Sequence, residues 1–359
     1  MDAGAELFQN NPMSVICSIV CDHEQQCAGH CVLGKKGNPV HFSSIENYIS
    51  DTYLDRMEIQ KVEKKGKRVA VIGAGPAGLT AAIILAKAGY DVTIYITQGA
   101  QDATRVARER AGEFDRIVCA GGDGTLNEVI TGLMQAETRP VLGYVPAGTT
   151  NDFAFSLGIS KVPAEAAVIA AGDTLQALDI GRFNDRYFNY IAAFGAFTEV
   201  SYETPQQTKN IFGRAAYIIE GIKALTNIKT YHIRVNSAET QMEDDFIYGM
   251  VTNTVSVGGF KTIRPDGVAL DDGLYEVLLI YPVENPMELQ WLANDLLTHN
   301  VESNRFAYFR TSKISFSSDD EVTWTLDGEF GGALHNVQIT NCSRAITFAT
   351  GKEPEGKES

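Results

Sequence analysis

One stretch of the chain combines glycines with acidic, hydroxyl and amide side chains at a place suited to binding phosphate. It follows an apolar run, opens a predicted helix and consists of Gly121, Gly122, Asp123, Gly124, Thr125, Leu126 and Asn127. Glycines at a strand end let backbone N–H groups approach phosphate oxygens, and the helix N-terminus favours negative charge. Because two anions repel each other, we expect Asp123 to hold a ribose hydroxyl or a magnesium-bound water. A tight turn would explain this loop if it stood alone.

It does not stand alone, because a second loop and two acidic motifs follow. Pro146–Asp152 again ends an apolar strand and contains Thr149. The acidic motifs are Asp271-Asp272-Gly273 and Asp327-Gly328-Glu329. Taken singly, each acidic motif is a turn, since Asp-Gly is a common turn pair. Together with the glycine loops they supply what phosphoryl transfer needs: positioning, oxygen ligands for a metal and a carboxylate near the nucleophile.

Two further groups lie upstream. Gly73, Gly75 and Gly78 share a loop after the apolar run Val69–Ile72, which indicates a strand–turn–helix. Four cysteines have the spacing C-x3-C-x5-C-x3-C and are Cys17, Cys21, Cys27 and Cys31. The acidic N-terminus does not resemble a secretory signal, so we expect a reducing compartment, in which a metal site is favoured over disulfides. Zinc, one iron–sulfur cluster and four free thiols remain as alternatives.

The length, composition and net charge of the chain exclude some classes of protein. The chain has 359 residues, 44% of them hydrophobic, and a net charge of −15. This length predicts two to three domains with a sizeable core. The negative charge argues against bulk electrostatic capture of nucleic acid. The uncharged run Val69–Ala86 reaches the length of a membrane span, but its glycines and Pro76 mark a turn within it, so we predict no span there.

Alternating strands and helices follow the charged linker 61–67. The predicted strands are Val69–Ile72, Asp91–Ile96, Arg116–Ala120 and Val141–Val145, and the predicted helices are Leu79–Ala88, Gln101–Ala111 and Leu126–Met134. This alternation indicates a doubly wound, Rossmann-like parallel sheet. Upstream of it, residues 1–66 form a cysteine-containing extension with one predicted helix, Ile45–Ile59.

From about Leu178 the alternation stops and short β-type runs dominate, which predicts a second, antiparallel domain. The runs are Tyr187–Ala192, Tyr231–Val235, Phe246–Thr252, Tyr275–Ile280, Lys313–Phe316 and Val322–Leu326, with helices at Gly213–Leu225 and Met287–Leu297. We interpret Ser317–Glu321 as a solvated turn. The expected division is 1–66, 67–177 and 178–335, followed by terminal strands within 336–351 of uncertain domain and a disordered tail, 352–359.

With these motifs in their order, the chain from about Gly89 to Gly351 resembles the bacterial diacylglycerol kinase family of lipid kinases. The matching segments are Gly121–Glu128, Pro146–Ala154, Val200–Pro205, Leu270–Gly273 and Leu326–Glu329. The resemblance implies an ATP site between the two domains, formed by Thr97, Gly121–Asn127 and Thr149. It implies a magnesium ion held by the side chain of Asp272 and the carbonyls of Ala269 and Leu274. It also implies that Glu329 accepts the proton of the lipid hydroxyl.

The family's first phosphate loop, Asn-Pro-x-Ser-Gly, is missing before Gly89, and the Gly73–Gly78 loop stands in its place. That loop resembles the fingerprint of flavin-dependent oxidoreductases, and residues 11–89 resemble the small subunit of glutamate synthase and related iron–sulfur flavoproteins. The match rests on the four cysteines, Val32-Leu33-Gly34 and Ile45-Glu46. The chain therefore resembles a fusion. The strand ending at Thr97 offers no acid for a flavin ribose, so we expect this half to be inactive as an oxidoreductase.

We therefore predict an ATP- and Mg²⁺-dependent kinase that converts diacylglycerol to phosphatidic acid, cytoplasmic and peripheral at the inner membrane face. A homodimer is left open. One alternative is an electron-transfer fragment that uses the cysteines and FAD, and another is a fusion with neither activity. The glycines of the substituted loop still lie at a helix N-terminus, so phosphate binding there can survive.

Overall fold

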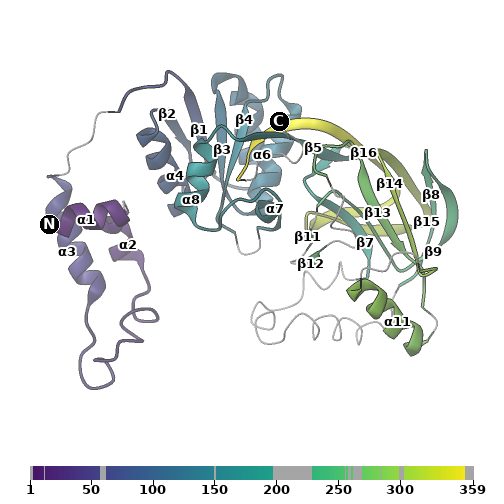
Figure 1. The fold of residues 1–359 in the computed structure, drawn as a ribbon, viewed down its shortest axis with the longest axis horizontal. Coiled ribbons are helices and arrows are strands. Elements are labelled where there is room, and N and C mark those ends of the chain that lie inside the picture. Colours follow the sequence, from purple (N-terminus) through teal and green to yellow (C-terminus); the bar gives the residue numbers. More distant parts are fainter. Residues whose placement is uncertain are drawn as a thin grey trace, which may run out of the picture.

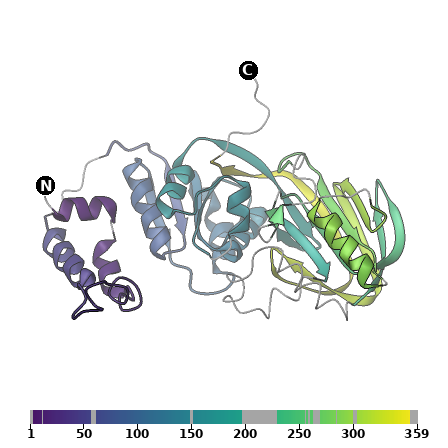
Figure 2. The same cartoon turned by 60° about the horizontal axis from the view of Figure 1, so that its bottom comes forward.

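The computed structural model describes residues 3–11, 13–56, 62–148, 151–196, 229–254, 256–257, 260–261, 269–283, 285–298 and 303–351. It shows a small helical extension, a layered α/β part and a β-rich part in that order along the molecule (Figure 1). The view turned by 60° shows the same succession (Figure 2). The mixed α/β fold class is therefore confirmed. No helix among the described residues is long and apolar enough to cross a membrane.

The extension contains α1 (Ala3–Asn10), α2 (Ser14–Val20) and α3 (Phe42–Leu54). The helices α2 and α3 meet through small polar residues, since Ser50 Oγ donates to Ser14 Oγ at 2.8 Å and both serines are buried. The apolar side chains Ile19 and Tyr48 are instead 65% and 74% exposed. The predicted helix Ile45–Ile59 begins earlier, at Phe42, and ends at Leu54, and residues 57–61 lie outside the described ranges.

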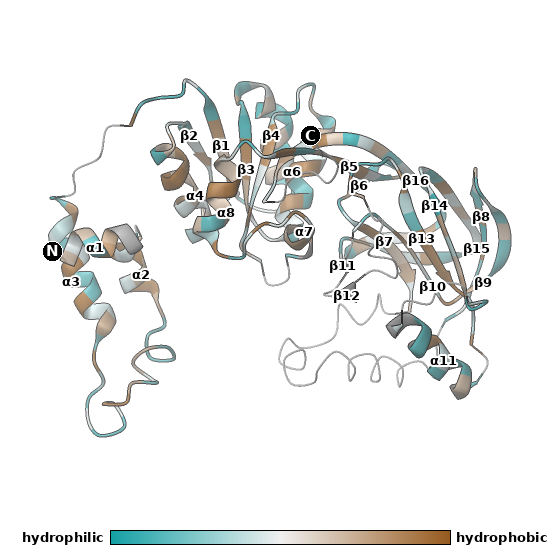
Figure 3. Ribbon diagram, viewed as in Figure 1, coloured by the Kyte–Doolittle hydropathy of each residue, from teal (hydrophilic) through white to brown (hydrophobic). Residues whose placement is uncertain are grey.

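The α/β part is a parallel sheet in the order β4-β3-β1-β2, flanked by helices. Its strands are β1 (Arg68–Ile72), β2 (Asp91–Tyr95), β3 (Arg116–Gly121) and β4 (Val141–Pro146), and its helices are α4 (Pro76–Lys87), α5 (Asp102–Arg110), the 3-10 turn η1 (Ala111–Glu113), α6 (Asp123–Gln135), α7 (Asp152–Ser156) and α8 (Pro163–Ala171). The continuous apolar runs of β1, β3 and β4 are buried at the centre of the sheet, whereas β2 is an exposed edge strand. Figure 3 shows the apolar residues concentrated on these central strands and on α4 and α8.

The β-rich part is mostly antiparallel. Its strands are β5 (Leu175–Phe183), β6 (Arg186–Phe188), β7 (Ile191–Gly195), β8 (Tyr231–Ser237), β9 (Gln241–Phe246), β10 (Tyr248–Thr252), β11 (Ser256–Val257), β12 (Phe260–Lys261), β13 (Tyr275–Ile280), β14 (Phe306–Thr311), β15 (Lys313–Leu326) and β16 (Glu329–Ala349), joined by one described helix, α11 (Pro286–Leu297). Its core is aromatic: Phe194 and Phe316 both pack edge-on against Trp324, with ring centroids 4.8 and 5.1 Å away. The predicted helix Gly213–Leu225 lies outside the described residues.

The 21-residue strand β16 joins the two parts. It pairs with β15 and β5 along most of its length, and Phe348 near its end pairs in parallel with Leu142 of β4. Residues 336–349 therefore belong to one strand that runs through the β-rich part and ends beside the α/β sheet. This arrangement makes the sheet continuous and fixes the position of the β15–β16 hairpin relative to the glycine loops.

Three strand predictions were wrong in detail. The run Phe246–Thr252 contains the last residue of β9 and the whole of β10, with a break at Ile247. Ser317–Glu321 is not a turn, because β15 continues through it and the register with β16 shifts between Ser317 and Val322, as in a β-bulge. The run Tyr187–Ala192 forms two strands instead of one, β6 and β7, with a break at Asn189-Tyr190. The N–H groups of these two residues donate to the side chain of Asp327.

Candidate active site

The two glycine loops lie in contact at the carboxyl ends of the adjacent strands β3 and β4. A Cβ on Gly148 would lie 2.8 Å from the Cα of Gly122, so only glycine fits there without displacement. The N–H of Ala147 donates to the carbonyl of Gly121 at 2.9 Å. Asn151, in the left-handed region with φ 53°, accepts from the Gly148 N–H at 3.0 Å and donates to its carbonyl at 2.7 Å. These contacts hold the backbones of the two loops close together.

The first loop forms the first turn of helix α6. The helix begins at Asp123, three residues before the predicted start, with Gly122 as its N-cap residue. Thr125 packs under Gly121, where a Cβ would lie 2.7 Å from the threonine Oγ1, and Leu126 is fully buried in the core. Backbone N–H groups in the first turn of a helix are suited to bind phosphate oxygens.

Glu329 lies over the same turn of α6. A Cβ on Gly124 would lie 3.7 Å from the Oε1 atom of Glu329, and the glutamate side chain is exposed. The two residues are far apart in sequence, and the hairpin between β15 and β16 brings them together. A carboxylate so placed, at the edge of a phosphate-binding turn, can take a proton from a hydroxyl that approaches the phosphate.

Asp327, two residues before Glu329, is buried and connects the hairpin to the loops. Its carboxylate accepts from the N–H groups of Asn189 (2.7 Å), Tyr190 (3.0 Å) and Ile191 (3.2 Å). It also accepts from Asn127 Nδ2 at 3.0 Å. Burial raises the pKa of Asp327 to about 6, although the four hydrogen bonds oppose that rise.

The substituted loop lies at the same edge of the sheet, after β1. A Cβ on Gly73, which has φ 106°, would lie 2.1 Å from the Ala120 carbonyl oxygen, and one on Gly78 would lie 1.9 Å from the Gly73 carbonyl oxygen. Packing therefore explains two of the three glycines. Gly75 is different: it is the N-cap residue of α4, and nothing lies within 4 Å of the place where a Cβ would be. Thr97 is half-buried just after the end of β2, at this edge.

The predicted magnesium ligands lie on the turn before β13. Asp272 Oδ1 accepts from the Leu274 N–H at 2.9 Å, and its Oδ2 pairs with Arg310. A carboxylate has about four lone-pair positions, and these two contacts use two of them. With the carbonyls of Ala269 and Leu274 the donor set consists only of oxygen, which suits Mg²⁺. Within the described ranges no group of three or more His, Cys, Asp or Glu side chains could hold a metal ion, so such a site depends on these carbonyls.

Asp179, which sequence reasoning missed, fixes this turn from inside. It is fully buried and accepts from the N–H of Gly273 (2.7 Å), the N–H of Arg344 (2.8 Å) and Asn341 Nδ2 (3.0 Å). Its sequence signal was a single acid between the apolar residues Leu178 and Ile180 of a strand.

Glu276, beside Arg310, makes the stability of the fold depend on pH. It is 3% exposed, and burial raises its pKa from an ordinary value near 4.5 to about 7 against the pull of Arg310, whose Nε donates to it at 3.0 Å. The folded protein then holds this proton more tightly than the unfolded chain. Its contribution to stability is therefore present below pH 4.5 and is lost as pH rises to 7, by about 3 kcal/mol.

We accordingly expect Glu276→Gln to reduce the fall of the unfolding free energy between pH 5 and 8, measured by urea unfolding at each pH. Asp327 adds a smaller slope of the same sign in both proteins. If the unfolding free energies of the wild type and the variant differ by the same amount at every pH in this range, Glu276 does not have a raised pKa.

The four clustered cysteines do not fit an iron–sulfur cluster or zinc here. All four are free thiols; Cys21 and Cys27 are exposed, and Cys17 and Cys31 are half-buried. No group of three potential ligands converges in the part of the chain that the structure describes.

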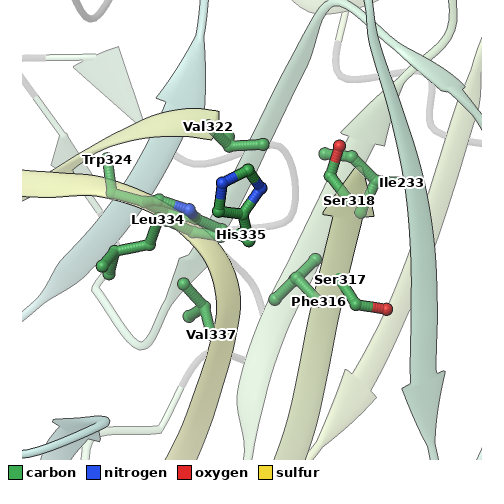
Figure 4. Close-up of a pocket in the computed structure, with 9 residues that line it drawn as sticks. All are labelled: Ile233, Phe316, Ser317, Ser318, Val322, Trp324, Leu334, His335 and Val337. Carbon is green, nitrogen blue, oxygen red and sulfur yellow. The ribbon is translucent and has the colours of Figure 1, made fainter. Parts of the chain in front are cut away.

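Several predicted residues lie outside the described ranges, namely Thr149 and the segment Val200–Pro205. A small hollow in the β-rich part, lined by Val322, Trp324 and His335 among others, contains none of the predicted site residues (Figure 4). It is too small to hold a water molecule, so it offers no substrate site.

Three protein-family models match parts of this chain. Residues 76–183 match the diacylglycerol kinase catalytic domain, and residues 193–346 match the YegS C-terminal NAD kinase beta sandwich-like domain. Residues 1–58 match dihydropyrimidine dehydrogenase domain II, 4Fe-4S cluster. The matched models define the class as a kinase with an α/β catalytic part and a β-sandwich part. The catalytic-domain match begins at Pro76, within the substituted loop Gly73–Gly78.

Individual proteins similar to this chain show the family to which it belongs. Diacylglycerol kinase from Bacillus subtilis (strain 168) is 34% identical over 273 residues, which are 74% of this chain and 88% of that protein. Diacylglycerol kinase from Staphylococcus epidermidis is 36% identical over 282 residues, covering 77% and 88%. A crystal structure of a diacylglycerol kinase from Bacillus anthracis str. Sterne superposes with a TM-score of 0.66 at 26% identity, covering 82% of this chain and 98% of that one. The chain therefore belongs to the diacylglycerol kinase family, which confirms the resemblance found in its sequence.

Proposed function

We propose that the protein is an ATP- and Mg²⁺-dependent lipid kinase that phosphorylates diacylglycerol to phosphatidic acid. The observation that carries this proposal is the position of the Glu329 carboxylate over Gly124, beside the paired glycine loops. A base beside a phosphate-binding turn is the arrangement that phosphorylation of a hydroxyl requires. Membership of the diacylglycerol kinase family supports the choice of acceptor.

The ATP phosphates would lie against the segment 121–127, on backbone N–H groups at the start of α6, between the loops after β3 and β4. Thr97 lies just after the end of β2. Thr149, which follows β4 in the sequence, would complete the nucleotide site with it. The Gly73–Gly78 loop would contribute the N-terminus of α4 in place of the family's Asn-Pro-x-Ser-Gly loop. The open backbone at Gly75 supports this assignment, because packing does not explain that glycine.

The chemical step forms one P–O bond and breaks another. As the lipid hydroxyl oxygen attacks the γ-phosphorus, Glu329 accepts the hydroxyl proton, and the bond to the β-phosphate oxygen breaks to release ADP. Magnesium, when bound, offsets the charge of the phosphates and, at Asp272, would hold the turn before β13. The glycine loops keep the phosphate and the hydroxyl in line, a contribution that misplacement by 1 Å can reduce about 10²-fold.

Because diacylglycerol lies in a bilayer and ATP in the cytoplasm, we propose that the enzyme works as a peripheral protein at the inner membrane face. The iron–sulfur alternative gains no support from the thiol positions. Phosphate transfer from ATP to diacylglycerol, sphingosine and NAD, each with Mg²⁺, tests the acceptor. Transfer to diacylglycerol alone is expected, and preferential transfer to another acceptor would overturn the proposal.

The role of the substituted loop can be tested at Gly75. We expect Gly75→Asp to raise the KM for ATP by about tenfold or more, because the new carboxylate would repel a phosphate at the N-terminus of α4. Stability should not fall, since the residue has φ −68° and ψ 177°, space for a side chain, and an N-cap position that aspartate favours.

The matched control is Gly37→Asp in the extension, where a Cβ also meets nothing within 4 Å. It should leave the KM for ATP unchanged. Equal KM values for Gly75→Asp and the wild type would show that phosphate does not lie at this loop.

A further inference from the structure

Helix α6 and the tip of the β15–β16 hairpin meet at two points. Gly124 faces the carboxylate of Glu329, and Asn127 donates to Asp327. Residues three apart on a helix lie on one face, so Gly124 and Asn127 present one surface to the hairpin. The two partners on the hairpin, Asp327 and Glu329, are likewise only two residues apart.

The tip is a two-residue turn in which Asp327 (φ 51°) and Gly328 (φ 84°) are both left-handed, flanked by the pair Leu326 and Glu329. This is the usual geometry of a short hairpin, and it needs only a residue that tolerates positive φ. A turn residue of this kind normally points its side chain into water. Asp327 is instead 7% exposed and accepts hydrogen bonds from three successive backbone N–H groups and from Asn127.

The amide of Asn127 is committed to this contact. Its Nδ2 carries two hydrogens and has two acceptors, the Tyr187 carbonyl at 3.1 Å and Asp327 Oδ2 at 3.0 Å. No N–H of this side chain remains to donate to a nucleotide. A hydrogen bond to a carboxylate is stronger and more directional than one between neutral groups.

We propose that Asn127 and Asp327 are a positioning pair that holds the hairpin tip, and with it Glu329, against the phosphate-binding turn of α6. The proposal rests on the proposed role of Glu329 as proton acceptor. The first turn of α6 would then both bind the phosphate and fix the distance from that phosphate to the base. Neither residue touches the reacting atoms.

The test is a double-mutant cycle on kcat with Asn127→Ala and Glu329→Gln. Asn127→Ala alone should lower kcat about 10- to 100-fold and leave the KM for ATP within about twofold. In the Glu329→Gln background the same change should cost less than about threefold, because there is no base left to position. Additive losses in kcat would overturn the proposal, because Asn127 would then act independently of Glu329. A rise in the KM for ATP that accounts for the defect would also overturn it and make the Asn127 side chain a nucleotide ligand.

A structural control separates positioning from general damage. Asn184 also joins two chain segments through its amide, to Gln338 N–H and the Asn336 carbonyl, and has φ 52°. Asn184→Gly keeps that conformation and removes the amide, so it should cost stability without changing kcat.

Hydrogen–deuterium exchange of residues 326–331 tests the positioning pair without any measurement of activity. We expect it to be faster in Asn127→Ala than in the wild type, with exchange of β8 and β9 unchanged. If the wild type phosphorylates no lipid, the proposed function fails, yet this exchange still decides the pair: unchanged protection of the hairpin tip would overturn it.

Discussion

Replacing Glu329 with glutamine is expected to lower kcat about 10²- to 10⁴-fold, the range typical for loss of a general base. Glutamine has the same size and keeps one oxygen acceptor but cannot take the hydroxyl proton. The side chain is exposed, so the free energy of unfolding should change by less than about 0.5 kcal/mol. The KM for ATP should stay the same, because in the proposed site the phosphates bind to backbone groups of the glycine loops.

The measurement is the initial rate of transfer to diacylglycerol in mixed micelles at saturating ATP, with urea unfolding of the same preparations. Glu321→Gln, an exposed glutamate on the bulge of β15, is the matched control and should retain wild-type kcat. A Glu329→Gln variant with more than about one-third of wild-type kcat would show that another group accepts the proton.

Replacing Asp179 with alanine is expected to be the most destabilising of these changes. The substitution leaves the backbone N–H groups of Gly273 and Arg344 and the amide of Asn341, all partly buried, without their acceptor. An unsatisfied buried group costs about 1–3 kcal/mol, and we expect a total loss of about 3–5 kcal/mol from these three partly buried groups. The turn that carries Asp272 is released at the same time, so magnesium affinity should fall with stability.

Two variants serve as controls in urea unfolding. Asp179→Asn keeps one acceptor oxygen and should lose about half as much, whereas Asp185→Ala changes an exposed acid near the β5–β6 turn and should be close to neutral. If Asp179→Ala loses less than about 1 kcal/mol, the three hydrogen bonds do not organise this turn.

Local patterns predicted the α/β part well because each of its strands is a short apolar run followed by a loop and a helix. The strands β1, β3 and β4 were predicted to within one residue, and so was β13 in the β-rich part. The same patterns misled at Ser317–Glu321, where three consecutive acids indicated solvent. A bulge lets β15 continue there while these acids stay at the surface.

The candidate site was predictable in its parts but not in its connections. Glycine spacing pointed to Gly121–Asn127, and the family motif pointed to Glu329, yet neither indicates that Asn127 donates to an aspartate 200 residues away. Asp179 likewise has its partners on Gly273, Asn341 and Arg344. Such contacts depend on tertiary packing, which the periodicity of a local sequence does not indicate. The same holds for Gly75, whose open surroundings became visible only beside the packed Gly73 and Gly78.

The most direct test of the central claim is transfer of labelled γ-phosphate from ATP to diacylglycerol in mixed micelles, with the lipid product separated by chromatography. We expect label in phosphatidic acid with the wild-type chain and Mg²⁺, and almost none without Mg²⁺ or with Glu329→Gln. A folded wild-type protein that leaves diacylglycerol unlabelled under these conditions would contradict the account and show that the substituted loop does not support the kinase reaction.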